Sequence, residues 1–211
     1  MYIFLSLVIS YLLGSIPFSL IIGKVFFKKD VRQYGSKNLG GTNAGRVLGK
    51  KVGLAVIALD HLKAILAIII TKSLISQFNP DLLNISLCLS AICIVIGHCY
   101  PIFSHFKGGK AVACTYGILF ASNIYVYLLA GLSFLIILKL TKYVSLSSVC
   151  SSFLAGLLFL IPFFQCSPFL SINLKYYWTL TIIIVAGFVT FKHRANIKRL
   201  KEGTENKIKW M

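Results

Sequence analysis

Long apolar stretches separated by short basic connections constrain the fold of this chain most strongly. Six stretches stand out, at residues 2–26, 52–70, 82–96, 111–138, 144–164 and 176–191. An α-helix rises about 1.5 Å per residue, so about 20 apolar residues cross the roughly 30 Å hydrocarbon layer of a bilayer. The sequence therefore predicts an all-α, polytopic membrane protein.

Composition supports this prediction and narrows the choice of partners. Hydrophobic residues make up 57% of the 211 positions, whereas ordinary soluble domains contain about 45–50%. Lys and Arg number 22 against five acidic residues, giving a net charge of +17, which calls for an anionic partner. Membrane lipid or a phosphorylated substrate fits the apolar background. We do not expect nucleic acid as a partner, because no soluble domain is present to bind it.

Acidic residues and cysteines are too dispersed to form a metal site. Metal-dependent transferases of phospho-alcohols bind their ions through several clustered carboxylates. The six cysteines form no CxxC pair and are interpreted as packing residues. We therefore expect no metal and no cofactor. The five acidic residues are Asp30, Asp60, Asp81, Glu202 and Glu205.

The basic connections predict the topology through the positive-inside rule. Four segments hold most of the positive charge, namely 28–51, 97–110, 139–143 and the tail after residue 191, whereas the other connections hold only Lys72 and Lys175. All four segments should be cytoplasmic, so an even number of crossings must join each consecutive pair. A single crossing by residues 111–138 would place the tail outside. The positive residues of the tail are Lys192, Arg194, Lys198, Arg199, Lys201, Lys207 and Lys209.

Residues 111–138 are therefore expected to form two helices. These 28 residues have a polar interruption at Ser122–Asn123, where a turn fits. We predict seven crossings in a single domain of residues 1–211, the fourth and fifth short, with the N-terminus outside and the C-terminus cytoplasmic. The run from Tyr2 to Gly23 should be a retained span, because no basic residue precedes it and the first positive charge, Lys24, lies on its far side. The alternative is one tilted helix followed by a re-entrant segment.

The first basic connection contains the glycine-rich segment 35–46, with the sequence GSKNLGGTNAGR. Glycines let backbone N–H groups turn toward an anion, the Ser, Thr and Asn side chains add neutral hydrogen bonds, and Arg46 can grip a phosphate through two parallel bonds. A phosphate cradle is one interpretation, and a flexible basic loop at the lipid surface is the other. The spacing does not match a P-loop.

The third stretch runs into a second glycine-rich segment, 97–110, with the sequence GHCYPIFSHFKGGK. Lys107 and Lys110 flank Gly108–Gly109 just before the next helix, so N–H groups, a positive helix end and two ammonium groups converge. This arrangement favours anion binding. His98, at the membrane boundary, is either a capped structural histidine or a functional one.

Other polar residues are less specific. Segment 193–203 of the tail is strongly basic, which by itself indicates only a cytoplasmic location. Segment 143–148 is rich in hydroxyl groups that could simply cap the following helix. Asp60 and Lys63 lie one helical turn apart within the second stretch. Ionisable groups there usually face a bundle interior or a site, so the pair is either structural or functional.

Four segments in order, GSKNLGGTNAGR, DHLKA, GHCYPIFSHFKGGKAVA and HRANIKRLKEGTENK, resemble the bacterial glycerol-3-phosphate acyltransferase family that uses acyl phosphate, the PlsY type. The resemblance covers the whole chain. Lys37, Ala64 and Ala111 stand where the family usually has glycine, Gly41 where alanine is common, and Cys114 where threonine is usual.

The resemblance implies transfer of a fatty acyl group from acyl phosphate to the 1-hydroxyl of glycerol 3-phosphate. The products are 1-acyl-glycerol 3-phosphate (lysophosphatidic acid) and phosphate, in the first step of phospholipid synthesis. It also implies a monomer in the bacterial cytoplasmic membrane, with its active site facing the cytoplasm.

Residue roles are implied in the same way. Lys110 and the glycine-rich turns would neutralise the phosphate of the donor, and Arg46, His193 and Asn196 would hold glycerol 3-phosphate. Either His193 or a substrate phosphate oxygen would remove the proton. The candidate catalytic residues are Lys110, His193 and Ser36. The candidate substrate-binding residues are Asn38, Gly40, Gly41, Thr42, Asn43, Arg46, His98, Lys107, Gly108, Gly109, Ser145, Ser148, Arg194 and Asn196.

Two rival classes are less consistent with the sequence. Acyltransferases with a soluble head use a His followed five positions later by Asp, and none of the four histidines here has an Asp at that spacing. A transporter for a phosphorylated metabolite would place its polar site near the membrane midplane. Only Asp60 and Lys63 favour that interpretation, since the other polar residues concentrate in the connections.

Overall fold

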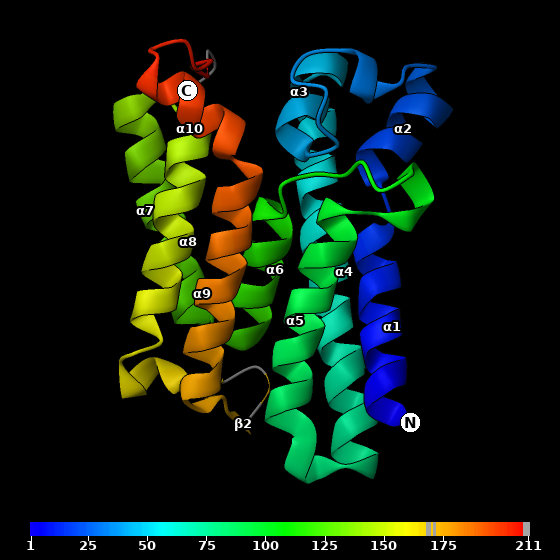
Figure 1. The fold of residues 1–211 in the computed structure, drawn as a ribbon, viewed down its shortest axis with the longest axis vertical. Helices are drawn as coiled ribbons and strands as arrows, with labels where there is room; N and C mark the ends of the chain where they lie inside the picture. The colour runs from blue at the N-terminus through cyan, green and yellow to red at the C-terminus, as the bar shows by residue number, and fades with distance from the viewer. Residues whose placement is uncertain (168–169, 171, 209–211) are drawn as a thin grey trace. The chain divides into compact units, whose positions relative to one another are not determined.

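The computed structural model describes residues 1–167, 170 and 172–208, so Lys209 of the basic tail lies outside the described residues. The described chain is almost entirely helical (Figure 1). It divides into two compact units, Met1–Ile118 and Leu119–Met211, with the boundary inside one helix, α6. Each unit is described by itself.

The first unit is built around three packed helices: α1 (Tyr2–Ser15), α4 (Lys50–Phe78) and α5 (Leu83–Cys99) (Figure 1). Small residues allow the close approach, because a Cβ added at Gly14 or Gly97 would overlap the backbone of the facing helix. Away from the basic connections, buried hydroxyl groups of the three helices hydrogen-bond to one another. The remaining elements of this unit are α2 (Phe18–Phe27), η1 (Val31–Gln33), α3 (Gly41–Leu48), η2 (Pro80–Leu82), η3 (Ile102–Ser104) and most of α6 (Val112–Ser122).

The first apolar stretch is broken rather than continuous. Helix α1 ends at Ser15, α2 begins at Phe18, and the two are inclined at 41°. Pro17 explains the break, because proline lacks a backbone N–H and its ring clashes with the preceding turn. The bend directs α2 toward the segment that carries the first glycine-rich motif.

The second unit packs α8 (Val144–Leu158) between α7 (Ile124–Thr141) and α9 (Lys175–Lys192) (Figure 1). Its one described sheet is a short antiparallel hairpin, β1 (Cys166–Ser167) with β2 (Ile172–Asn173), preceded by η4 (Pro162–Gln165). Helix α10 (Arg194–Lys201) follows α9 at an angle of 61°.

The predicted turn at Ser122–Asn123 is confirmed. Helix α6 ends at Ser122, and Asn123 caps α7 by accepting hydrogen bonds from the backbone N–H groups of Tyr125 (2.9 Å) and Val126 (3.1 Å). The prediction that both helices are short is correct for α6, with 11 residues, and wrong for α7, with 18. Helix α7 continues past residue 138 through Lys139 and Leu140, so it ends at Thr141, inside the basic connection.

Among the described residues, three helical segments are long and apolar enough to cross a membrane, and five are if each bent pair counts as one span. The long segments are Lys50–Phe78, Pro80–Ser104 and Ile124–Thr141. The bent pairs are α1 with α2 and α9 with α10, while α6 and α8 are shorter apolar helices. The all-α architecture is thus confirmed, and the length and composition of these segments fit membrane spans.

Candidate functional site

Asn43 organises the first glycine-rich segment. Its buried side-chain amide donates to the carbonyls of Val31 and Asn38, both at 2.9 Å, while its Oδ1 accepts from the N–H of Ser36 at 2.7 Å. These bonds tie three points of the segment together. Asn43, predicted to bind substrate, therefore uses its polar atoms chiefly to shape the segment.

Part of the segment predicted as a loop is helix α3, which begins at Gly41 with Gly40 as its N-cap. Glycines bring α3 against α4, because a Cβ at Gly53 would lie 2.6 Å from the Cα of Gly45. Gly41 likewise packs closely on α4, as a Cβ there would overlap the side chain of Ile57. The glycines here serve helix packing as well as a turn.

The segment is also attached to α2. Ser19 donates to the carbonyl of Leu39 at 2.5 Å, and Leu39 packs into a small apolar cluster with Leu20 and Val31. Asn38 accepts from the N–H of Gly40 at 2.8 Å. With the backbone held in this way, the side chains of Ser36 and Arg46 remain exposed and Thr42 is half-buried.

An ion pair between Arg32 and Asp30 lies near the start of the first basic connection, outside the apolar stretches. Arg32 contacts the carboxylate of Asp30 at 2.6 Å, and Lys24 lies 3.9 Å from it. The hydrogen bond from Arg32 lowers the pKa of Asp30 to about 2, so this carboxylate is charged at neutral pH.

His98 and the turn at Gly108–Gly109 form one packed unit in the second glycine-rich segment. The N–H of Gly109 donates to the carbonyl of His98 at 3.0 Å. A Cβ at Gly109 would overlap Nε2 of the His98 imidazole, and one at Gly108 would overlap the His98 carbonyl oxygen. Lys107 is exposed and Lys110 is half-buried just before α6. Lys107, the glycine turn and Lys110 stand directly before α6, which begins at Val112.

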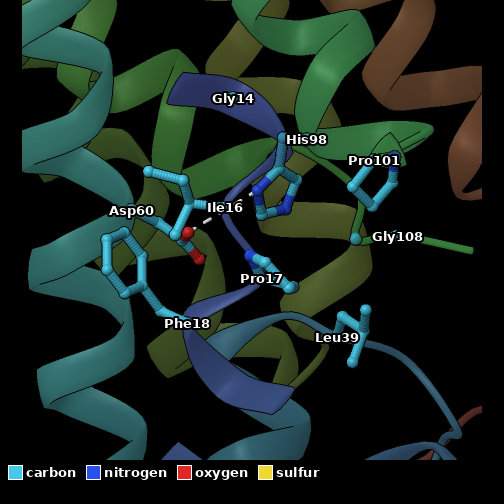
Figure 2. Close-up of a pocket in the computed structure, with 10 residues that line it drawn as sticks. Gly14, Ile16, Pro17, Phe18, Leu39, Asp60, His98, Pro101 and Gly108 are labelled. Carbon is cyan, nitrogen blue, oxygen red and sulfur yellow. Dashed lines mark ion pairs between the residues drawn. The ribbon is translucent and has the colours of Figure 1, made fainter. Parts of the chain in front are cut away.

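Asp60 and Lys63 join His98 in a buried charged cluster. The Lys63 ammonium lies 2.8 Å from Asp60 Oδ1 and 3.0 Å from His98 Nδ1, and His98 Nδ1 lies 3.6 Å from the same carboxylate oxygen. Lys63 Nζ and His98 Nδ1 thus both approach the same oxygen of Asp60. Figure 2 shows Asp60 and His98 facing one another in a small pocket that Leu39 and Gly108 also line. This pocket brings the two glycine-rich segments together.

In the second unit, Ser145 and Asn196 meet on a carboxylate that sequence reasoning missed. Glu205 Oε1 accepts from Ser145 Oγ at 2.9 Å and from Asn196 Nδ2 at 2.6 Å, while Oε2 accepts from Arg199 Nε at 2.8 Å. Burial raises the pKa of Glu205, but these hydrogen bonds outweigh it and hold the pKa below its usual value. The sequence did contain one signal for this contact, because Glu205 is an acidic residue in a basic tail and has hydrogen-bonding side chains close to it in the sequence.

His193 is buried at the end of α9. Its Nδ1 lies 2.8 Å from the carbonyl of Val189, which can only accept, so Nδ1 carries the proton and Nε2 holds the lone pair. That tautomer can act as a base. Ser148 donates to the carbonyl of Val144 within its own helix at 2.7 Å, and exposed Arg194 stacks on Phe191 at 4.5 Å.

One group of described residues has metal-ligand chemistry. Ligand atoms of Asp60, His98 and Cys114 all lie within 4.8 Å of one another. The Lys63 ammonium, however, already contacts both the carboxylate and the imidazole, so a lysine supplies the cation of this cluster.

Comparison with known proteins confirms the resemblance. The profile of a family described as glycerol-3-phosphate acyltransferase matches residues 4–203. The chain is 43% identical over 210 residues to the glycerol-3-phosphate acyltransferase of Enterococcus faecalis, covering 99% of this chain and 93% of that protein. It is 40% identical over 207 residues to the glycerol-3-phosphate acyltransferase of Geobacillus kaustophilus, and the match covers 98% of this chain and 96% of that protein.

Solved structures agree. The glycerol 3-phosphate form of PlsY, an integral membrane glycerol 3-phosphate acyltransferase, superposes with a TM-score of 0.86 at 33% identity, covering 99% of this chain and 96% of that chain. The lysophosphatidic acid form of PlsY gives a TM-score of 0.84 at 32% identity, with the same coverage. By sequence over nearly its full length and by its helical fold, this chain is an acyltransferase of the glycerol-3-phosphate acyltransferase family.

Proposed function

We propose that this enzyme transfers a fatty acyl group from acyl phosphate to the 1-hydroxyl of glycerol 3-phosphate. The products are 1-acyl-glycerol 3-phosphate and inorganic phosphate. The names of the curated relatives support the acceptor, as do the glycerol 3-phosphate and lysophosphatidic acid forms of PlsY. One observation carries the donor class, namely the Gly108–Gly109 turn that His98 holds between Lys107 and Lys110.

The donor phosphate would bind at this turn. The two ammonium groups, with backbone N–H groups of the turn other than that of Gly109, neutralise its charge. That charge increases on the leaving phosphate as the acyl C–O bond breaks. Lys110 acts on the leaving group, with Ser36, Thr42 and the first glycine-rich segment as further donors. Acyl phosphate is already activated, so the reaction needs neither a covalent enzyme intermediate nor a cofactor.

Arg46, His193 and Asn196 hold glycerol 3-phosphate, with Ser145 or Ser148 near its hydroxyls. The hydroxyl oxygen of the acceptor attacks the acyl carbonyl carbon, and its proton passes to Nε2 of His193 or to a substrate phosphate oxygen. The tautomer of His193, with its proton held on Nδ1 by the Val189 carbonyl, supports the first route.

The membrane topology is part of the proposal. A monomeric single domain of seven crossings would have its N-terminus outside, its C-terminus in the cytoplasm and its active site at the cytoplasmic face of the bacterial inner membrane. The positive residues in the connections and the tail support this orientation. A topology reporter fused after Asn123 tests this arrangement, which places that connection outside. A reporter signal from the cytoplasm would eliminate the seven-crossing arrangement.

The donor class is tested with purified protein in a lipidic phase and labelled glycerol 3-phosphate. Palmitoyl phosphate, palmitoyl-CoA and palmitoyl acyl carrier protein are supplied separately, without added metal. We expect label in lipid with palmitoyl phosphate only. Turnover with a thioester only would refute the proposed donor.

Lys110→Ala tests the leaving-group role. We expect turnover to fall by about 10²–10³-fold, the usual cost of one preorganised donor to developing charge. Lys139→Ala removes an exposed positive residue at the end of α7 and is the matched control. Near-normal turnover by folded Lys110→Ala protein would refute this role.

A further inference from the structure

The charged cluster of Asp60, Lys63 and His98 lies inside the three-helix bundle of the first unit. Asp60 and Lys63 are each 2% exposed and His98 is 6% exposed. Ionisable side chains within a membrane bundle cost several kcal/mol unless they are paired, so they usually mark a functional role. The contacts of this cluster indicate which role it has.

Lys63 holds the break between α1 and α2. Besides Asp60 and His98, its ammonium lies 2.9 Å from the carbonyl of Gly14 and 2.9 Å from that of Ile16. These carbonyls stand at the end of α1, where Pro17 interrupts the helix and leaves acceptors without intrahelical partners. Lys63 therefore stabilises the bend from which α2 departs.

His98 holds the second glycine-rich segment. Its carbonyl accepts from the N–H of Gly109, and its imidazole packs so closely on Gly109 that no Cβ fits. A shift of the imidazole would move the Gly108–Gly109 turn, and with it Lys107 and Lys110. The position of the imidazole is set by the contact of its Nδ1 with Lys63 at 3.0 Å.

The first glycine-rich segment depends on the same cluster through α2. Ser19, in the first turn of α2, donates to the carbonyl of Leu39 at 2.5 Å. Leu39, Gly108 and Gly109 line one pocket together with Asp60 and His98 (Figure 2). Both segments expected to bind phosphate thus rest on one intramembrane ion pair.

We propose that Lys63 and Asp60 are positioning residues for the donor phosphate: Lys63 fixes the His98 imidazole and the end of α1, and Asp60 fixes Lys63. This inference rests on the proposed function for its substrate. Neither residue contacts a reacting atom, so their replacement should raise the KM for acyl phosphate rather than abolish the chemistry.

The test compares Lys63→Met with Thr71→Val. Thr71 is also buried on α4 and donates to Ser90 of α5 at 3.0 Å, but it contacts neither glycine-rich segment, so its loss should affect stability alone. We expect Lys63→Met to raise the KM for palmitoyl phosphate at least about tenfold, because small displacements of positioning groups can cost this much or more. Thr71→Val should leave that KM unchanged.

Two further variants make the test specific. If Lys63 acts through His98, Lys63→Met adds little to the KM effect of His98→Ala in the double variant. Should Lys63→Met fail to fold because Asp60 is left unpaired, the double variant Lys63→Met with Asp60→Asn removes that charge and should show the same rise in KM.

Hydrogen exchange gives a readout that needs no turnover. Amides of residues 104–110 should exchange faster in the Lys63 variants and at the wild-type rate in Thr71→Val, whichever acyl donor the enzyme uses. Failure of the proposed function would show as wild-type protein inactive with palmitoyl phosphate. Unchanged exchange and unchanged KM in folded Lys63 variants would overturn the positioning role. If the KM effects of Lys63→Met and His98→Ala multiply in the double variant, the route through His98 is overturned.

Discussion

Replacing Glu205 with Gln should release the tail that follows α10. The carboxylate accepts three hydrogen bonds, and its side chain is 6% exposed. In Glu205→Gln the carbonyl oxygen can keep the bonds from Ser145 and Asn196, but the new NH₂ group then faces Nε of Arg199. One charge-assisted bond is lost and two are weakened, so we expect a cost of about 2–4 kcal/mol.

Hydrogen exchange of the tail amides measures this cost. The N–H of Thr204 bonds to the Arg199 carbonyl and that of Ile208 to the Lys142 carbonyl, so both report tail opening. Exchange should be faster by roughly 30- to 1,000-fold, since each 1.4 kcal/mol is about tenfold. Glu202→Gln is the control, because its surface pair with Lys198 at 3.8 Å is worth about 0–1 kcal/mol. Equal exchange in the two variants would refute the reasoning.

The same carboxylate predicts a pH dependence. The folded-state pKa of Glu205 lies below its ordinary value of 4.5, so its contribution to stability is fully present above that value and is lost as pH falls through the lowered pKa. Tail protection against exchange, corrected for intrinsic rates, should therefore be constant from neutral pH to about pH 5 and decline only in stronger acid. A decline already between pH 7 and 5 would contradict this assignment.

Further predictions concern the glycine-rich segments. Lys37 has a φ of 55° where the family usually has glycine, so Lys37→Gly should stabilise the protein by about 0.5–1 kcal/mol in thermal unfolding, and Lys37→Ala should not. Gly109→Ala should reduce kcat/KM for palmitoyl phosphate at least about tenfold because its Cβ meets His98, whereas Gly187→Ala has open space and should be neutral. Asn43→Asp cannot donate to two backbone carbonyls and should lower both melting temperature and turnover; wild-type values would contradict its structural role.

Sequence reasoning succeeded where a single local signal decides the structure. Asn123 stands at the polar interruption of a long apolar run, and it caps α7. The bend at Pro17 had an equally local signal, but the continuous apolar character of residues 2–26 concealed it. Helix α3 was missed because four glycines in twelve residues are typical of a loop, whereas Gly41 and Gly45 serve close packing on α4.

Long-range partners could not be predicted from the sequence. The Asp60–Lys63 pair was recognisable from its spacing of one helical turn, but its link to His98 joins residues 35 positions apart. Glu205 was interpreted only as one of five dispersed acidic residues, and its partner Ser145 lies 60 positions before it. Lys37 and Ala111, noted as departures from family glycines, both adopt positive φ, at 55° and 60°. The family pattern therefore indicated the backbone conformation there more reliably than this sequence alone.

The most direct test of the proposed reaction is its stoichiometry, measured with purified enzyme, ³²P-labelled glycerol 3-phosphate and palmitoyl phosphate as sole acyl donor. We predict one unlabelled phosphate released for each labelled lysophosphatidic acid formed, with no label in free phosphate. Phosphate release without lipid product, or lipid formation only when a thioester replaces palmitoyl phosphate, would contradict the proposed mechanism.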